Sequence, residues 1–102
     1  MPAAPKLLDP IHPGEILLED FMKPLGISIN RLARDLSVPP NRVHSIVHGR
    51  RAITADTALR LGEYFGVTPQ TWLNLQAGYD LRVAERAAGE EIRRSVRRRD
   101  AA

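Results

Sequence analysis

Cysteine is absent from the 102 residues, so the chain can form no disulfide framework and no thiolate metal site, and it has no catalytic thiol. Long apolar runs are lacking as well. No stretch approaches the roughly 20 residues that a membrane-spanning helix needs, and the N-terminus does not have the layout of a signal peptide. We therefore expect a soluble protein located in the cytoplasm, with no membrane partner.

Aromatic residues are few, and a core must therefore be mostly aliphatic. A chain of this length makes one domain, near the small end of what can bury an adequate core. No strand pattern and no internal repeat is present. Amphipathic helical patterns instead start near five positions, each marked by a proline or a capping residue. These positions are Pro13, Ser28, Pro40, Thr54 and Pro69. The sequence predicts a compact all-α domain of five helices, with Leu17, Leu18, Phe21 and Leu25 forming the inner face of the first.

Two of these helical patterns lie between residues 28 and 51 with almost no room between them. Each has an apolar face at helical spacing: Ile29, Leu32, Ala33 and Leu36 in the first, and Val43, Ile46 and Val47 in the second. Only Ser37 and Val38 separate the two patterns. Helices joined this tightly cross steeply, which leaves one face of the second helix open. This is the geometry of a helix-turn-helix, with the motif at 28–48.

The open face of the second helix is polar and basic. With the apolar residues turned inward, its outward side chains are Asn41, Arg42, Ser45 and His48, and Arg50 and Arg51 follow directly. No carboxylate occurs between residues 36 and 55. Arginine, asparagine and serine hydrogen-bond to base edges and phosphates in a major groove. A single arginine could equally belong to an ordinary solvated face, but the combination favours DNA binding.

The overall charge agrees with a polyanionic partner. The formal net charge is +3, and the positive charge is concentrated on residues 28–52, where five arginines accompany a single acid. Charge gathered on one motif is typical of a specific DNA binder. The basic tail at 89–102 has two apolar anchors, Ile92 and Val96. It is either a solvated end or a segment that contacts nucleic acid or a protein partner.

The sequence has only weak candidates for a catalytic or metal-binding site. His44 and His48 have the i, i+4 spacing that lets two imidazoles share a metal, but the sequence supplies neither the glutamate of HExxH nor a third ligand. No serine has a base and an orienting acid at a recognisable spacing, and no phosphate-binding loop is present. We expect neither an enzyme nor a bound cofactor or metal.

Three stretches carry a family resemblance. The segments HPGEILLEDFMKPLGIS and GVTPQTWLNLQAGYDL, with the helix-turn-helix between them, resemble HigA-type antitoxins of the lambda-repressor-like (XRE) class. The resemblance runs from His12 to about Glu85. It implies a homodimeric antitoxin that binds a small mRNA-cleaving toxin and represses its own operon at a palindromic operator.

The resemblance also implies roles for individual residues. Asn41, Arg42 and Ser45 would reach bases, whereas Asn30 and Arg50 would meet the DNA backbone. The sequence departs from the family pattern in two ways: Ser37 is commonly glycine, and the tandem Pro39-Pro40 removes two backbone donors. The complete predicted DNA-binding set is Ser28, Asn30, Pro39, Asn41, Arg42, Ser45, His48, Arg50 and Arg51.

The segment from Pro69 to Val83 has more apolar residues than one helix face can bury, which predicts a dimer interface there. The predicted contacts are Trp72, Leu75, Tyr79, Leu81 and Val83. The alternative is that this helix simply closes the small core. The resulting organisation is an extended arm at 1–12, a DNA-binding domain with its dimerisation helix at 13–88, and the tail at 89–102; the C-terminal helix could extend further.

Two other functions remain open at the level of the sequence. One is a stand-alone helix-turn-helix transcription regulator with no toxin. The other is a protein-interaction module that has lost DNA binding, although acidic substitutions on the outer face would then be expected and none occurs there. A basic reading frame directly upstream would favour the antitoxin over the stand-alone regulator.

Overall fold

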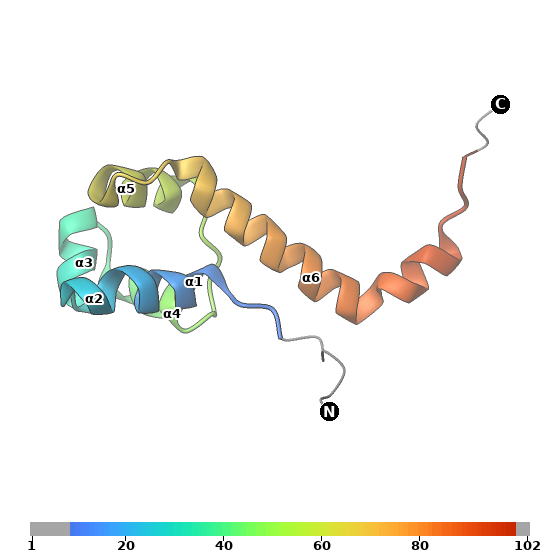
Figure 1. The fold of residues 1–102 in the computed structure, drawn as a ribbon, viewed down its shortest axis with the longest axis horizontal. Helices are drawn as coiled ribbons and strands as arrows, with labels where there is room; N and C mark the ends of the chain where they lie inside the picture. The colour runs from blue at the N-terminus through green and yellow to red at the C-terminus, as the bar shows by residue number, and fades with distance from the viewer. Residues whose placement is uncertain (1–8, 100–102) are drawn as a thin grey trace.

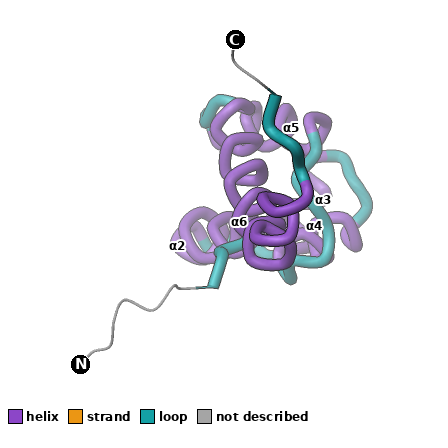
Figure 2. The backbone as a smooth tube through the Cα atoms, turned by 90° about the vertical axis from the view of Figure 1, so that its right-hand side faces the viewer, coloured by secondary structure: helices purple, strands orange, loops and turns teal. Residues whose placement is uncertain are grey.

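The computed structural model describes residues 9–99, and every regular element in that range is helical (Figures 1 and 2). The first helical stretch combines α1 (Pro13–Ile16), the π-helical η1 (Leu17–Met22) and α2 (Lys23–Leu25). It is followed by α3 (Ile29–Leu36), α4 (Pro40–Val47), α5 (Ala55–Phe65) and α6 (Pro69–Ser95). The prediction of a five-helix, all-α domain with a helix-turn-helix is confirmed.

The π-helical turn η1 changes which residues of the first stretch face the core. Its widened turn closes with the backbone N–H of Lys23 donating to the carbonyl of Leu18, directly before Pro24, which has no N–H to donate. Residues five apart then share a face, so Leu17 and Met22 are each 1% exposed. Leu25 is 61% exposed. The prediction of Leu25 as a core residue assumed a regular α-helix and is wrong.

The motif helices meet through the turn that the sequence predicts. Ser28 caps α3, its hydroxyl oxygen accepting a hydrogen bond from the backbone N–H of Arg31 at 3.1 Å. Ser37 adopts the left-handed conformation, with φ of 60°. The backbone N–H of Val38 donates to the carbonyl of Ala33 at 3.0 Å and closes the turn. A serine therefore occupies the conformation for which this motif commonly uses glycine.

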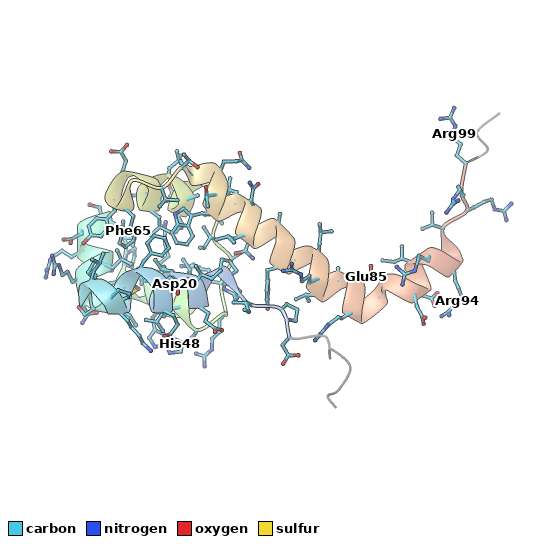
Figure 3. All side chains as sticks on the ribbon, viewed as in Figure 1. Asp20, His48, Phe65, Glu85, Arg94 and Arg99 are labelled. Atoms are coloured by element: carbon cyan, nitrogen blue, oxygen red, sulfur yellow. The ribbon has the colours of Figure 1, made fainter. Side chains whose placement is uncertain are left out.

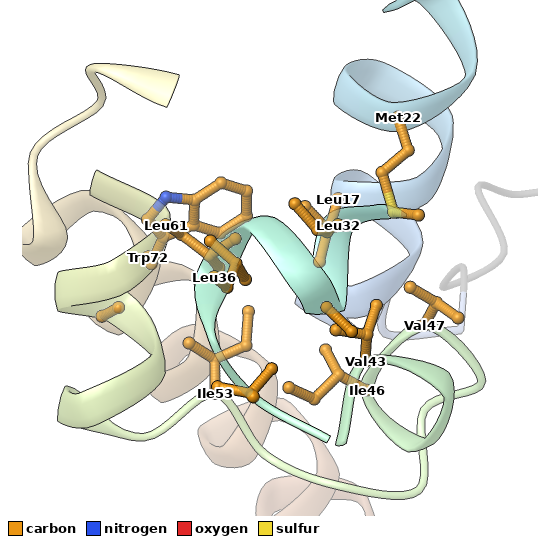
Figure 4. Packing of buried hydrophobic residues seen from close by; sticks show 13 residues of the cluster. Leu17, Met22, Leu32, Leu36, Val43, Ile46, Val47, Ile53, Leu61 and Trp72 are labelled. Atoms are coloured by element: carbon orange, nitrogen blue, oxygen red, sulfur yellow. The ribbon is translucent and has the colours of Figure 1, made fainter. Parts of the chain in front are cut away.

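The core lies where the first helical stretch and α3, α4, α5 and α6 converge (Figure 4). Leu32, Ala33 and Ile46 are at most 1% exposed, as the periodicity predicts. The ring of Phe21 lies 5.1 Å from that of Phe65 and 5.1 Å from that of Trp72. The aliphatic core thus closes on one side with three aromatic rings, of which only the indole is fully buried.

Helix α6 closes the core with its first turns and then leaves the domain (Figure 1). It remains helical through Gly78 and Gly89 to Ser95, and its axis bends sharply in its C-terminal part (Figure 1). The Glu85 side chain lies over Gly89 and accepts a hydrogen bond from Arg93 at 2.7 Å, which supports the helix across the glycine. The predicted domain boundary after residue 88 falls inside this helix. The tail prediction for 100–102 and the arm prediction for 1–8 lie outside the described residues.

Candidate DNA-binding surface

Helix α4 presents one face to the core and one to the exterior. Val43, Ile46 and Val47 are buried, which fixes the rotation of the helix about its axis. After Val47 the chain turns sharply, with Gly49 at φ of 73° and the backbone N–H of Arg50 donating to the carbonyl of Ser45 at 2.8 Å. The sharp turn keeps the basic residues that follow beside the end of α4.

The predicted DNA-binding residues lie on the outside of the motif, with two of them partly covered. Arg42 and Ser45 are half-buried on the flank of α4. The hydroxyl of Ser28 is occupied by its cap to Arg31, so this residue stabilises α3 in the free protein. The remaining predicted residues are exposed: Asn30, Pro39, Asn41, His48, Arg50 and Arg51.

An ion pair on this surface joins residues that are distant in the sequence. A guanidinium nitrogen of Arg42, Nη1, lies 2.7 Å from Oδ1 of Asp56, in the first turn of α5. Arg60 donates from Nε to the same oxygen at 2.8 Å. The hydrogen bonds from Arg60 and then from Arg42 hold the pKa of Asp56 below its ordinary value. We call Arg42, Asp56 and Arg60 the Asp56 cluster.

The Asp56 cluster also reaches the turn between the motif helices. Nη1 of Arg60 donates to the carbonyl oxygen of Leu36 at 2.8 Å and lies 3.5 Å from that of Ser37. It thereby satisfies a carbonyl that the C-terminus of α3 leaves without an intrahelical partner. Thr54, predicted to cap α5 with its side chain, occupies the N-cap position but makes no such hydrogen bond.

The Asp56 cluster is not predicted by the sequence patterns. Asp56 is the first acid after the acid-free stretch that ends at residue 55, and that position was the available signal. A contact across fourteen residues depends on how α5 packs against the motif, which helical periodicity does not specify.

The rings of His44, in α4, and His48, at its C-cap, lie close together with their planes tilted by 37°. The rings of His44 and His48 have centroids 4.2 Å apart, and Nδ1 of His48 lies 2.8 Å from the backbone carbonyl of His44. Because a carbonyl oxygen can only accept, Nδ1 of His48 is the donor of this hydrogen bond. Within residues 9–99, no cluster of three or more histidine, cysteine, aspartate or glutamate side chains could hold a metal ion.

The start of α1 is clamped against the end of α4. Nδ1 of His12 accepts a hydrogen bond from the backbone N–H of Gly14 at 2.8 Å, and its ring meets the edge of Tyr79 with centroids 4.9 Å apart. Partial burial lowers the pKa of His12, and the nearby Asp80 carboxylate opposes that effect. The HPG segment therefore joins the first helix to α6 and, through Gly14, to the carbonyl end of α4.

The predicted dimer contacts divide into three groups by their burial. Trp72 is 1% exposed in the core of this chain, so it offers no surface to a second copy, and its prediction as an interface residue is corrected. Leu75 and Tyr79 are half-buried. Leu81 and Val83, beyond the body of the domain, are 72% and 42% exposed.

No helix in the described part of the chain is long and apolar enough to cross a membrane.

The helix-turn-helix family model matches residues 18–72, more than half of the chain, and this protein is a member of that class. The match includes α3, the turn, α4 and α5, together with the start of α6.

Similarity to individual proteins identifies the family within the helix-turn-helix class. Virulence-associated protein I of Dichelobacter nodosus is 53% identical over 85 residues, which are 83% of this chain and 79% of that protein. An addiction module antidote protein of the HigA family from Coxiella burnetii has a TM-score of 0.85 and 49% identity, covering 90% of this chain and 100% of that one. The Pseudomonas aeruginosa antitoxin HigA, solved with the higBA promoter, has a TM-score of 0.84 and 45% identity, covering 86% and 96%. Within the helix-turn-helix class, this chain belongs to the HigA antitoxin family.

Proposed function

We propose that this protein is the antitoxin of a type II toxin–antitoxin module. It binds operator DNA in the cytoplasm, represses its own operon, neutralises an mRNA-cleaving toxin and has no enzymatic activity. The observation that carries the proposal is the acid-free outer face of α4, which ends in Arg50 and Arg51. This face lies on a fold shared with a HigA antitoxin that was solved with promoter DNA.

In this proposal α4 enters the major groove. Asn41, Arg42 and Ser45 read base edges, since amide, guanidinium and hydroxyl groups match the donors and acceptors there. Arg50 and Asn30 meet phosphates and fix the position of the motif on the duplex. Pro39 and Pro40 supply no backbone N–H to a phosphate, so phosphate binding depends on the side chains of Arg50 and Asn30.

A two-fold dimer gives the required affinity. One recognition helix spans only a few base pairs, and two copies place their recognition helices about 34 Å apart, one DNA turn. Helix α6 is the surface that a second copy of this chain would cover, because it leaves the domain and carries exposed Leu81 and Val83. Residues two positions apart on a helix are rotated by roughly 200° about the helix axis. The side chains of Leu81 and Val83 therefore lie on different faces of α6.

The dimer is tested by introducing glutamate at Leu81 and Val83, singly and together. The double variant should sediment as a folded monomer and lose most of its operator affinity, and the single variants identify the face that pairs. Arg82→Glu, between them and exposed, is the control. An unchanged dimer in the double variant would place the interface elsewhere, and a wild-type monomer at micromolar concentration would remove the dimer from the proposal.

The toxin is tested with the neighbouring reading frame. Co-expression of this chain with its tagged upstream neighbour should yield a complex on pull-down, and the chain should rescue growth when that neighbour alone is toxic. Sequence-specific DNA binding without a toxic neighbour would instead identify the stand-alone regulator. A chain that binds neither operator nor random DNA would indicate the protein-interaction module.

A further inference from the structure

The arginine that the proposed function assigns to base reading is not free on the surface. Nη1 of Arg42 lies 2.7 Å from Oδ1 of Asp56, and the Arg42 side chain is 29% exposed. We propose that Asp56 is a positioning residue for DNA recognition. It holds Arg42 in the orientation that reads a base and suppresses attraction between Arg42 and phosphates of any sequence. This inference rests on the proposed function.

The geometry leaves Arg42 able to hydrogen-bond while it is held. A guanidinium carries five N–H donors, and the hydrogen bond to Asp56 uses Nη1. Donors on the other two nitrogens can therefore address the O6 and N7 acceptors of a guanine. An arginine fixed at one nitrogen also loses less rotational freedom when it meets that base.

Asp56 is itself held by a second arginine. Arg60 donates to the same carboxylate oxygen at 2.8 Å while its own Nη1 is bonded to the carbonyl of Leu36. The carboxylate therefore cannot simply follow Arg42 toward the DNA. If Arg42 swings out to a phosphate, Asp56 loses one of its two partners and faces the negatively charged backbone.

In this proposal Asp56 contributes more to the preference for operator over random DNA than to the stability of the fold. Asp56 has a side chain that is 56% exposed, and exposed ion pairs contribute little to folding. Its charge matters more to DNA, because it neutralises one of the arginines on the recognition surface for phosphates of every sequence. Specificity improves when wrong partners are penalised, and a carboxylate beside a polyanion supplies that penalty.

The test is Asp56→Asn, which keeps the size of the side chain and removes its charge. Affinity is measured for the operator and for a random duplex over a range of salt concentrations. We expect affinity for random DNA to rise up to about fivefold, the equivalent of about 1 kcal/mol. The salt dependence on random DNA should steepen by about one unit of slope, because Arg42 is released to a phosphate. The ratio of operator to random affinity should fall accordingly.

Glu63→Gln is the matched control, because it makes the same change of charge on α5, two turns further along, at an exposed residue. Asp56→Glu keeps the carboxylate and should restore most of the discrimination. In an Arg42→Ala background, Asp56→Asn should leave the ratio of affinities unchanged. Thermal unfolding of each variant checks that the domain remains folded.

Two results would overturn this inference while leaving the proposed function intact. Equal effects of Asp56→Asn and Glu63→Gln would show a general charge effect. An undiminished effect of Asp56→Asn in the Arg42→Ala background would show that Asp56 acts through Arg60 and the turn. If the wild-type protein itself bound operator and random DNA equally, the proposed function would fail and this inference with it. If the wild-type protein still prefers operator over random DNA, the proposed function stands and only the inference about Asp56 has failed.

Discussion

The backbone of Gly14 lies directly against the carbonyl oxygen of Ile46, with no space for even a methyl group. The contact joins the start of α1 to the last turn of α4. Because the obstructing atoms belong to the backbone, they cannot rotate away as a flexible side chain would. We predict that Gly14→Ala lowers the free energy of unfolding by about 1–3 kcal/mol through overpacking, measured by urea denaturation.

Gly78 supplies the control for that substitution. It lies inside α6 with nothing within 4 Å of the position a Cβ would take. Gly78→Ala should therefore stabilise the protein by about 0.5–1 kcal/mol, since alanine loses less backbone entropy in a helix. Equal changes in stability at the two positions would contradict the close contact assigned to Gly14.

The second prediction concerns pH. Nδ1 of His12 must be unprotonated to accept the hydrogen bond from Gly14, and burial lowers the pKa of His12 in the folded protein. The unfolded chain therefore binds a proton at higher pH than the folded chain does. Stability from His12 is complete above its ordinary pKa of about 6.5. It is lost as the pH falls from there through the lowered pKa of the folded state.

The measurement is urea unfolding at a series of pH values between about 7.5 and 5. His12→Asn is the comparison, because asparagine can cap a helix without titrating in this range. The wild-type protein should lose stability relative to this variant as the pH falls. A constant difference between the two proteins across the series would contradict the capping role of neutral His12.

Base reading is predicted for Arg42. Arg42→Ala should cost about 1–3 kcal/mol of binding free energy on the operator and relax the preference at one base pair in each half-site. The measurement is fluorescence anisotropy with a set of operators, each changed at a single base pair. Equal weakening on operator and random DNA would show that Arg42 meets phosphate.

Arg50 should behave differently, because it follows α4 and is exposed. Arg50→Ala should weaken binding to operator and random DNA alike, and the salt dependence of the affinity should become shallower by about one unit of slope. Binding titrations at several salt concentrations supply the measurement. An unchanged slope would remove the phosphate contact assigned to Arg50.

Much of the motif could be predicted from the sequence because its causes are local. The apolar spacing from Ile29 to Val47 fixes the inner faces of α3 and α4, and the two residues between them force a tight turn. Ser37, the position that the family resemblance marks as commonly glycine, adopts the left-handed conformation. The capping interactions of Ser28 and His12 also act within three residues of each helix start.

What could not be predicted depends on packing between distant segments. The π-helical turn before Pro24 replaces Leu25 by Met22 in the core, and a pattern count based on 3.6 residues per turn cannot detect it. Trp72 looked like a surface contact because α6 has too many apolar residues for one face. Its burial depends on aromatic neighbours such as Phe21, fifty-one positions earlier.

The side chains of α6 beyond the domain, around Glu85 and Arg94, are shown in Figure 3.

Sequence-specific DNA binding by this protein can be tested with a pair of binding titrations. Purified protein is titrated into a labelled duplex from the region upstream of its own gene and into a scrambled duplex of the same composition, at physiological salt. We expect a dimer bound to a palindromic site with at least about 10³-fold preference over the scrambled duplex. Equal affinity for the two duplexes, with the same salt dependence, would contradict it.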